Sequence, residues 1–242
     1  MVTTTVAASA GELEAALRKA GLSEIDAATR RRAEYSSDAS NYRVVPLVVA
    51  FPRSAGELAA ALDVCRALGV PLVGRGAGTS IAGNALSTGL VLDTSRYLNR
   101  VLSVDPDGRT AVVEPGAILD SITAAAAPFG LRFGPDPSTH SRATIGGSIG
   151  NNACGSRALR YGRTADNVVA LDVLTGTGAR FTARRYGNEE PLSDVAPEAG
   201  LLASMRTLAD GGLATVRTEF GRFTRQVYGY SLEHLLPENG FD

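Results

Sequence analysis

The sequence predicts an α+β fold. Strand-like and helix-like stretches follow one another without the strict alternation that a doubly wound sheet requires. Two antiparallel hairpins, at 100–116 and 168–183, are expected beside a single strand–helix–strand unit at 47–73. The chain has 242 residues, 44% of them hydrophobic and 20% charged, which is enough apolar material for a folded core in one large domain or two small ones.

Two helices near the N-terminus carry matching start and stop signals. Residues 9–21 begin with Ser9 and Glu12 at the spacing of a capping box, and residues 54–69 begin with Ser54 and Glu57 at the same spacing. Each stretch closes on a glycine. The second helix lies between the apolar runs 47–51 and 70–73, which are expected to be strands.

The rest of the chain is predicted to contain a mixture of hairpins, a strand and helices. The turn of the first hairpin is predicted at Asp105-Pro106-Asp107-Gly108, because these residue types favour tight turns. The other expected elements are a strand at 89–95, a helix at 117–128 closed by Gly130, a weaker helix at 197–210 and a polar tail.

Composition excludes several function classes. A net charge of −1 with dispersed signs argues against a nucleic-acid partner. Two cysteines and two histidines predict neither a disulfide framework nor a metal site. The N-terminus lacks the pattern of a secretory signal, and the longest apolar stretch, 44–51, is too short to span a bilayer. We therefore expect a cytoplasmic protein, attached to a membrane at most through something outside this chain.

The stretch LVGRGAGTSIAGNA at 72–85 runs from a predicted strand into a glycine-rich loop. Consecutive N–H groups in such a loop can form an anion-binding nest, which favours a phosphate ligand. A dinucleotide fingerprint would need a third glycine at Thr79, and a P-loop would need a lysine at Asn84, so neither pattern fits. A glycine-rich turn with no ligand is the alternative.

A second segment, 134–167, has the same small-residue character. Loops of this length are uncommon in compact domains unless they are functional. Its glycines would let the backbone approach a ligand closely, and Thr144, Asn151 and Asn152 offer hydrogen-bonding side chains. Together the two segments predict a dinucleotide bound along the domain. A structural Ω-like loop is the alternative for the second segment.

The two glycine segments resemble those of the vanillyl-alcohol oxidase/p-cresol methylhydroxylase (PCMH) flavoprotein family. LVGRGAGTSIAG resembles the pyrophosphate loop of that family, and PDPSTHSRATIGGSIGNNACG followed by YGRTADNV resembles its second FAD-binding segment. The upstream stretch YSSDASNYRVVPLVVAFPRSAGEL is similar to the usual opening of the domain. The likeness covers roughly residues 35–183. Within the family, the chain is most similar to the FAD subunits of D-lactate, glycolate and D-2-hydroxyglutarate dehydrogenases.

The resemblance implies a set of FAD contacts. The pyrophosphate would lie on Arg75, Gly76, Ala77, Gly78, Thr79 and Ser80, with Gly83 and Asn84 closing the loop. The second side would be formed by Pro135, Asp136, Ser138, Ala143, Thr144, Gly146, Gly147, Gly150, Asn152, Ala153 and Gly155. The adenosine end would lie at Tyr161, Gly162 and Asp166 to Val168.

The resemblance also bears on how FAD is attached. Family members with covalent flavin usually carry a histidine in the first loop, where this chain has Thr79, so non-covalent FAD is expected. His140 is expected to have a surface or hydrogen-bonding role, and His234 is expected to have no chemically active groups around it. No catalytic residue is assigned from the sequence.

The implied fold is a PCMH-type FAD-binding fold, two α/β subdomains with FAD between them, without the C-terminal substrate domain. The expected divisions are an N-terminal helical segment at 1–34, the FAD-binding domain at 35–220 and the start of a connection at 221–242.

The implied activity is oxidation of a D-2-hydroxy acid by hydride transfer to flavin N5. The substrate would bind through a C-terminal domain beyond Asp242. The NNACG motif resembles the motif of the family branch that is fused to an iron–sulfur module, and that module would accept the electrons. The alternatives are an FAD-binding module without catalysis of its own, and a sugar- or aldonolactone-oxidising flavoprotein.

Overall fold

The computed structural model describes residues 8–187, 196–220, 222 and 230–242 of the chain. Parts of the predicted N-terminal segment 1–34 and of the predicted connection 221–242 lie outside the described residues. The chain divides into two compact units, residues 1–151 and residues 152–242. Each unit is described separately below.

The first unit is built on a four-stranded sheet with strand order β1-β2-β4-β3. Its strands are β1 (Ile25–Asp26), β2 (Val48–Ala50), β3 (Leu72–Arg75) and β4 (Leu90–Asp93). Strands β2 and β3 each pair in parallel with β4, and β1 pairs antiparallel with β2. The predicted strand–helix–strand unit is therefore confirmed, but β4 is inserted between its two strands.

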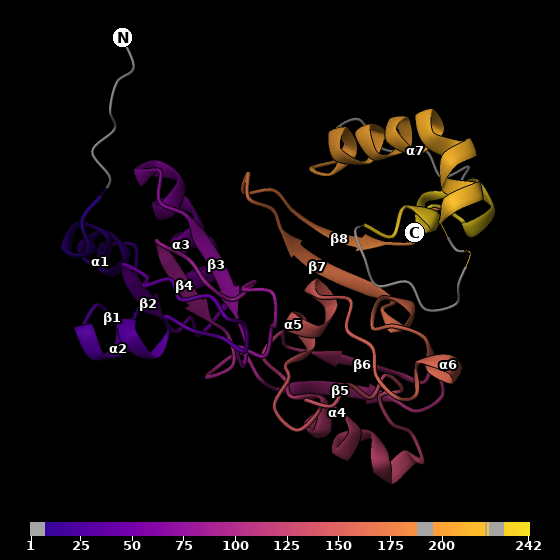
Figure 1. Cartoon of the computed structure of the whole chain (residues 1–242), viewed down its shortest axis with the longest axis horizontal. Helices are drawn as coiled ribbons and strands as arrows, with labels where there is room; N and C mark the ends of the chain where they lie inside the picture. Colours follow the sequence, from indigo (N-terminus) through magenta and orange to yellow (C-terminus); the bar gives the residue numbers. More distant parts are fainter. Residues whose placement is uncertain (1–7, 188–195, 221, 223–229) are drawn as a thin grey trace. The chain divides into compact units, whose positions relative to one another are not determined.

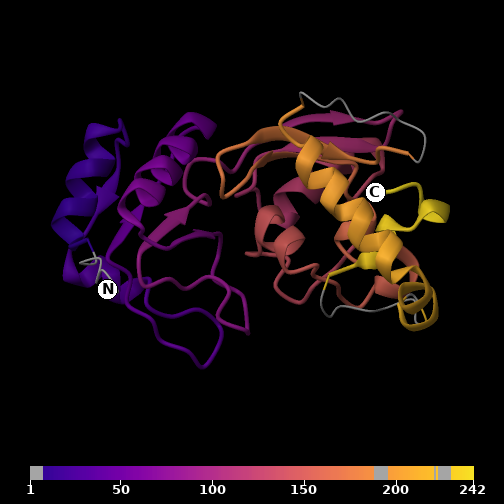
Figure 2. The same ribbon diagram turned by 90° about the horizontal axis from the view of Figure 1, so that it is seen from above.

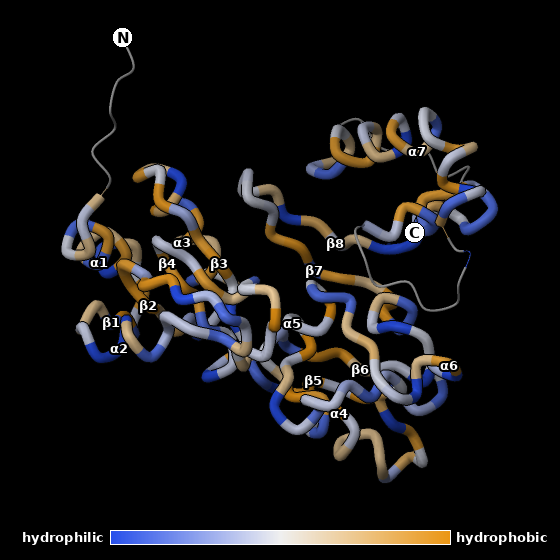
Figure 3. The backbone as a smooth tube through the Cα atoms, in the orientation of Figure 1, coloured by the Kyte–Doolittle hydropathy of each residue, from blue (hydrophilic) through white to orange (hydrophobic). Residues whose placement is uncertain are grey.

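The two faces of this sheet follow from the alternation of side chains along each strand. Val48, Ala50, Leu90 and Leu92 pack with Leu13 of α1 (Ala10–Lys19) and with residues of α3 (Ala55–Leu68). Figures 1 and 2 show α1 and α3 lying side by side. The intervening residues Val49 and Val91 pack on the opposite side with Phe51, Tyr35, Val73 and Tyr97. Figure 3 shows the hydrophobic residues of β2 and β4 at the centre of this arrangement.

The helix boundaries obey the predicted capping signals. Ser9 accepts a hydrogen bond from the Glu12 N–H, and the Glu12 carboxylate accepts one from the Ser9 N–H, completing the box. Ser54 also accepts from the Glu57 N–H, but the Glu57 carboxylate accepts from the Arg53 N–H, so the box predicted for α3 is only half formed. Gly69 ends α3 in the left-handed conformation. A short helix, α2 (Thr29–Glu34), was not predicted; it has no buried residues and no side-chain cap.

The remainder of the first unit is a hairpin covered by helices. Strands β5 (Val101–Asp105) and β6 (Thr110–Val113) pair antiparallel, as predicted. Their turn is held by the Asp105 carboxylate, which accepts hydrogen bonds from the N–H groups of Asp107 and Gly108. Helix α4 (Leu119–Ala126), the 3₁₀ turn η1 (Ala127–Phe129) and helix α5 (Ile145–Gly150) complete the unit.

The second unit contains the predicted second hairpin and a long helix. Strands β7 (Ala170–Leu174) and β8 (Arg180–Arg184) pair antiparallel. Helix α7 (Ala199–Glu219) packs on Leu235 of the 3₁₀ turn η3 (Leu232–Leu235) and on Phe241 through Leu202 and Ala209. Its Arg217 pairs with Glu238 of the next turn, η4 (Pro237–Asn239). The unit begins with helix α6 (Ala158–Tyr161) and the 3₁₀ turn η2 (Ala165–Asn167).

Two expectations about elements are wrong. The segment 134–167 is not one long loop, because it contains α5, α6 and η2. The weaker helix predicted to end at Asp210 continues to Glu219 through Gly211 and Gly212. Its buried residues Leu202, Ala209 and Val216 recur every seven positions, so packing along one face outweighs the low helix propensity of glycine. Among the described residues, no helix is both long enough and apolar enough to cross a bilayer.

Candidate functional site

The candidate site of the first unit lies where its parallel strands end. Strand β3 ends at Arg75 and leads directly into residues 76–85, which contain no helix or strand. Strand β4 runs parallel to β3, so its last residue, Asp93, lies opposite Arg75 in the sheet register. Open sheets with parallel strands commonly bind ligands at the carboxyl ends of those strands.

The loop 76–85 presents a row of backbone donors. In the part of the chain that the structure describes, the N–H groups of residues 76–81 donate to no protein acceptor. The Ser80 hydroxyl accepts from the N–H groups of Ala82 (3.2 Å) and Asn84 (3.3 Å), which turns the chain back on itself. Gly78 and Gly83 have φ values of +66° and +79°, a region that side chains disfavour. This is the geometry expected of an anion-binding nest.

The second glycine segment meets this loop at two points within the first unit. Gly76 lies directly against Thr144, the residue that precedes α5: a Cβ at Gly76 would overlap the Thr144 hydroxyl and lie 2.9 Å from its Cβ. At the other end of the loop, the Asn84 amide donates to the Asn151 side-chain oxygen at 3.4 Å. The two glycine segments therefore contact each other at Gly76 and Thr144 and at Asn84 and Asn151, while their shared ligand stays a prediction.

The remaining predicted contact residues of the first unit are in varied surroundings. Ala143, Thr144 and Pro135 are buried, Asp136 is half-buried near Arg132, and Ser138, Gly147 and Gly150 are exposed. Gly146 packs on Pro115, where a Cβ would lie 2.9 Å from the proline Cβ. Its small size therefore serves the protein's own packing. Their contacts with a cofactor stay predictions.

His140 has the hydrogen-bonding role that the sequence predicts. Its Nδ1 lies 2.6 Å from the Asp120 carboxylate on α4, and both side chains are about half exposed. No nucleophile accompanies the pair among its described contacts. It is assigned no catalytic role.

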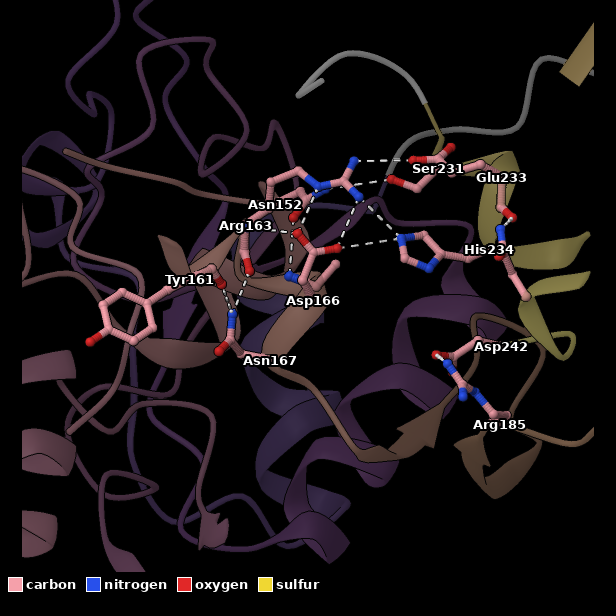
Figure 4. A network of polar contacts seen from close by, with 12 residues as sticks. Asn152, Tyr161, Arg163, Asp166, Asn167, Arg185, Ser231, Glu233, His234 and Asp242 are labelled. Carbon is pink, nitrogen blue, oxygen red and sulfur yellow. Dashed lines mark hydrogen bonds and ion pairs between the residues drawn. The ribbon is translucent and has the colours of Figure 1, made fainter. Parts of the chain in front are cut away.

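In the second unit, the predicted contact residue Asp166 belongs to a polar network around Arg163 (Figure 4). Arg163 has 9% of its side chain exposed, and its guanidinium donates to Asp166 from Nε (3.1 Å) and Nη2 (2.9 Å). The same guanidinium donates to Glu233 at 3.1 Å and contacts His234 Nε2 at 3.2 Å. The network therefore joins residues 163–166 to the C-terminal turn η3.

The network also explains the charge state of Asp166. Burial opposes ionisation of this carboxyl, but the hydrogen bonds and charge of Arg163 outweigh it and lower the pKa. The expectation that His234 has no chemical surroundings is wrong, because Arg163 and Asp166 both lie within reach of its ring. No sequence pattern indicated this contact, since 71 positions separate Arg163 from His234.

Most other predicted residues of this unit serve its own fold. Asn152 has a φ of +44°, and its side-chain oxygen accepts from the Ala165 N–H at 3.1 Å. The Ala153 carbonyl accepts from the Thr164 N–H and hydroxyl, and the Tyr161 carbonyl accepts from Asn167. Gly162 is pressed against Asp166, while Gly155 and Val168 are half-buried. Their contacts with adenosine stay predictions.

Comparison with known proteins identifies the family to which this chain belongs. Residues 46–184 match the model of the FAD-binding domain family, which covers both glycine segments. The chain belongs to the FAD-binding domain family. The curated relatives of this FAD-binding domain include the D-2-hydroxyglutarate dehydrogenase of Pseudomonas putida, 33% identical over 98% of the chain and 24% of that protein. They also include the glycolate oxidase subunit GlcD of Escherichia coli K12, 40% identical over 64% of the chain and 32% of that protein.

Solved structures show the same fold. An alkyldihydroxyacetonephosphate synthase matches this FAD-binding domain with a TM-score of 0.65 and 20% identity, over 79% of the chain and 38% of that structure. A carbohydrate oxidase from Microdochium nivale matches with a TM-score of 0.61 and 20% identity, over 71% of the chain and 37% of that structure. The predicted α+β, PCMH-type fold is therefore confirmed. The chain spans about a quarter to a third of the length of these curated relatives.

The first unit fits FAD as its cofactor. The donors of residues 76–81 need an acceptor outside the protein, and a pyrophosphate supplies several oxygen acceptors. Thr144 fills the space beside Gly76, so loop and helix approach at backbone distance. Sequence reasoning did not single out Asp38 and Tyr42, which contact this loop, or Tyr35, which contacts Arg75, because nothing in their spacing relates them to it.

Proposed function

We propose that the chain is the FAD-binding part of a flavin-dependent dehydrogenase that oxidises a D-2-hydroxy acid of the D-lactate, glycolate or D-2-hydroxyglutarate class. The observation that carries the proposal is the row of N–H donors at residues 76–81, held against Thr144 of the second glycine segment. The names of the curated relatives, D-2-hydroxyglutarate dehydrogenase and glycolate oxidase subunit, support the substrate class.

In this proposal, the residues of the chain bind FAD and orient it. The N–H groups of residues 76–81 would hold the pyrophosphate without a lysine or a metal ion, because a nest of backbone donors carries its own partial positive charge. The contact between Asn84 and Asn151 would keep the two glycine segments at a constant separation. Bound FAD supplies the acceptor for the hydride that leaves C2 of the hydroxy acid. No residue of this chain is assigned as the catalytic acid or base.

We propose that FAD is bound non-covalently. The position at which flavin-linked relatives in the resembled family carry a histidine is Thr79, whose hydroxyl is not a usual flavin attachment group. Residues 75–85 contain neither histidine nor cysteine, so the loop offers no side chain for a stable flavin bond.

An absorption spectrum before and after acid precipitation tests cofactor and attachment together. A flavin spectrum in the purified chain, released into the supernatant by acid, is the expected result. Colour retained in the pellet would contradict non-covalent binding. A colourless chain that takes up no added FAD would contradict the cofactor proposal itself.

The substrate and electron acceptor are further parts of the proposal. We propose that the hydroxy acid is bound mainly by parts of the protein outside this chain, with an iron–sulfur domain or subunit as the electron acceptor. A steady-state assay with D-lactate and D-2-hydroxyglutarate and an artificial acceptor tests this, because turnover by residues 1–242 alone would show that the chain contains a substrate site. The cytoplasmic location is likewise a proposal, which cell fractionation tests.

A further inference from the structure

We infer that the segment Tyr35–Tyr42, which we call the support segment, positions the glycine loop 76–85 for its ligand, with Asp38 and Tyr42 as the positioning residues. The inference deepens the proposed function and rests on it, since it concerns the same loop. None of these residues was predicted to take part in the site.

The support segment is hydrogen-bonded to both ends of the loop. The Ala39 N–H donates to the Gly78 carbonyl at 3.0 Å, which ties the segment to the nest itself. The Asp38 carboxylate accepts a long hydrogen bond of 3.5 Å from the Ala85 N–H, at the far end of the loop. Its other oxygen accepts from the Ser40 N–H at 2.8 Å, which fixes the carboxylate in place.

Asp38 also interacts with the charge of Arg75, whose guanidinium lies against the loop. Arg75 folds back so that a Cβ at Gly78 would lie 2.9 Å from its Cζ, and its Nη1 donates to the Ala85 carbonyl at 3.4 Å. Burial raises the pKa of Asp38, but the hydrogen bonds from Ser40 and Ala85 and the charge of Arg75 outweigh it and lower that pKa below its usual range. The ionised Asp38 carboxylate therefore lies beside the Ala85 N–H and interacts with the positive charge of Arg75.

A second series of contacts connects the Arg75 side chain to the end of β4. The Arg75 guanidinium lies 4.9 Å from the centre of the Tyr35 ring, a cation–π distance. The Tyr35 hydroxyl donates to Asp93 at 2.5 Å, and Asp93 is buried at the end of β4. The Asp93 carboxylate also accepts from the Ser95 N–H and hydroxyl. Consecutive contacts thus connect β4 through Tyr35 and Arg75 to the loop.

The Tyr42 ring packs against the loop at Gly83. A Cβ at Gly83 would lie 2.9 Å from Cδ2 of the Tyr42 ring, so glycine at 83 and an aromatic ring at 42 are complementary. The ring stays against Gly83 although 63% of the residue is exposed to solvent. An exposed aromatic in contact with a loop backbone restricts the loop by packing, without a hydrogen bond of its own.

These contacts give the segment a role beyond general stability. A nest binds an anion well only if its N–H groups are already arranged, because ordering them on binding costs conformational entropy. The support segment restricts the carbonyl of Gly78, the amide of Ala85 and the backbone at Gly83. Loss of that restriction should weaken ligand binding while the sheet and its core remain intact.

The test measures FAD affinity and amide hydrogen exchange in the whole chain. Asp38→Ala and Tyr42→Ala should each weaken FAD binding roughly tenfold, the order expected when one or two hydrogen bonds or a packing contact are lost. Exchange of the hydrogen-bonded amides at 82–86 should accelerate, and exchange in β2 and β4 should not. Asp38→Asn keeps the acceptor oxygen and loses the charge, so it should restore part of the affinity.

Matched controls separate positioning from folding. Asp105→Ala removes another turn-capping aspartate of the same unit and should leave FAD affinity unchanged. Tyr42→Phe keeps the ring against Gly83 and should restore the affinity that Tyr42→Ala loses. Unchanged FAD affinity in Asp38→Ala and Tyr42→Ala would overturn the inference. If the wild-type chain binds no FAD, the proposed function fails, and exchange at 82–86 alone then decides the inference: acceleration supports it and an unchanged rate overturns it.

Discussion

Gly76 shows how a single residue sets the distance between the two glycine segments. The Thr144 side chain occupies the space where a Cβ of residue 76 would lie, and Thr144 itself is buried. A side chain at 76 could be accommodated only by moving the loop away from α5. The glycine is required here by close packing, because its φ does not lie in the positive region that favours glycine.

Gly76→Ala should therefore destabilise the chain by about 2 kcal/mol, as overpacking of a close contact does, and weaken FAD binding at the same time. Gly74→Ala is the matched control. Gly74 precedes Gly76 by two positions, and nothing lies within 4 Å of a Cβ added there. Urea unfolding and flavin titration of the two variants provide the comparison; equal behaviour of both would contradict the role assigned to the Thr144 contact.

At the scale of elements, Arg163 joins η2 to the C-terminal turn η3. Its removal leaves the carboxylates of Asp166 and Glu233, with side chains 29% and 15% exposed, without their shared cation. Arg163→Gln should cost about 3 kcal/mol, the lower end of the range for breaking a buried ion pair. Arg163→Lys keeps the charge but not the forked geometry, and should cost less. Chemical denaturation measures both; a loss within experimental error for Arg163→Gln would contradict this account.

The contact between α7 and η4 predicts a pH dependence. Hydrogen bonds from Arg217 lower the pKa of the exposed Glu238 carboxyl to about 2, from an ordinary value of 4.5. Because the folded-state pKa is the lower one, the contribution is complete above about pH 4.5 and is lost as the pH falls toward 2. The melting temperatures of wild type and Glu238→Gln should therefore differ most at neutral pH and converge near pH 2. A difference in melting temperature that grows as the pH falls would contradict the expected direction of this pH dependence.

For the whole molecule, binding of FAD should appear as added stability. A ligand that binds only the folded state contributes about 2.7 kcal/mol at a concentration 100 times its dissociation constant. The melting temperature of the apo chain should rise steadily with the logarithm of FAD concentration, and Gly76→Ala should show a smaller rise at each concentration. A melting temperature independent of FAD, in a chain that is otherwise folded, would contradict FAD as the ligand of this domain.

Local signals in the sequence predicted much of the fold. Ser9 and Ser54 cap their helices, Gly69 and Gly130 end theirs, and Asp105 makes the hairpin turn, because each acts on backbone groups within a few residues. The same holds for the glycine loop after β3. By itself, therefore, the sequence determined most of the elements, the two glycine segments and, through their likeness to known FAD-binding segments, the family.

Only the tertiary structure decided what those segments touch. The insertion of β4 between β2 and β3, the contact of Gly76 with Thr144 and the Arg163 network all join residues far apart in the chain. The contacts from Asp93 through Tyr35 to Arg75 likewise depend on parallel strands ending at one edge of the sheet. Local propensity carries no information about such pairings, because they arise from strand register and from the packing of side chains that the fold brings together.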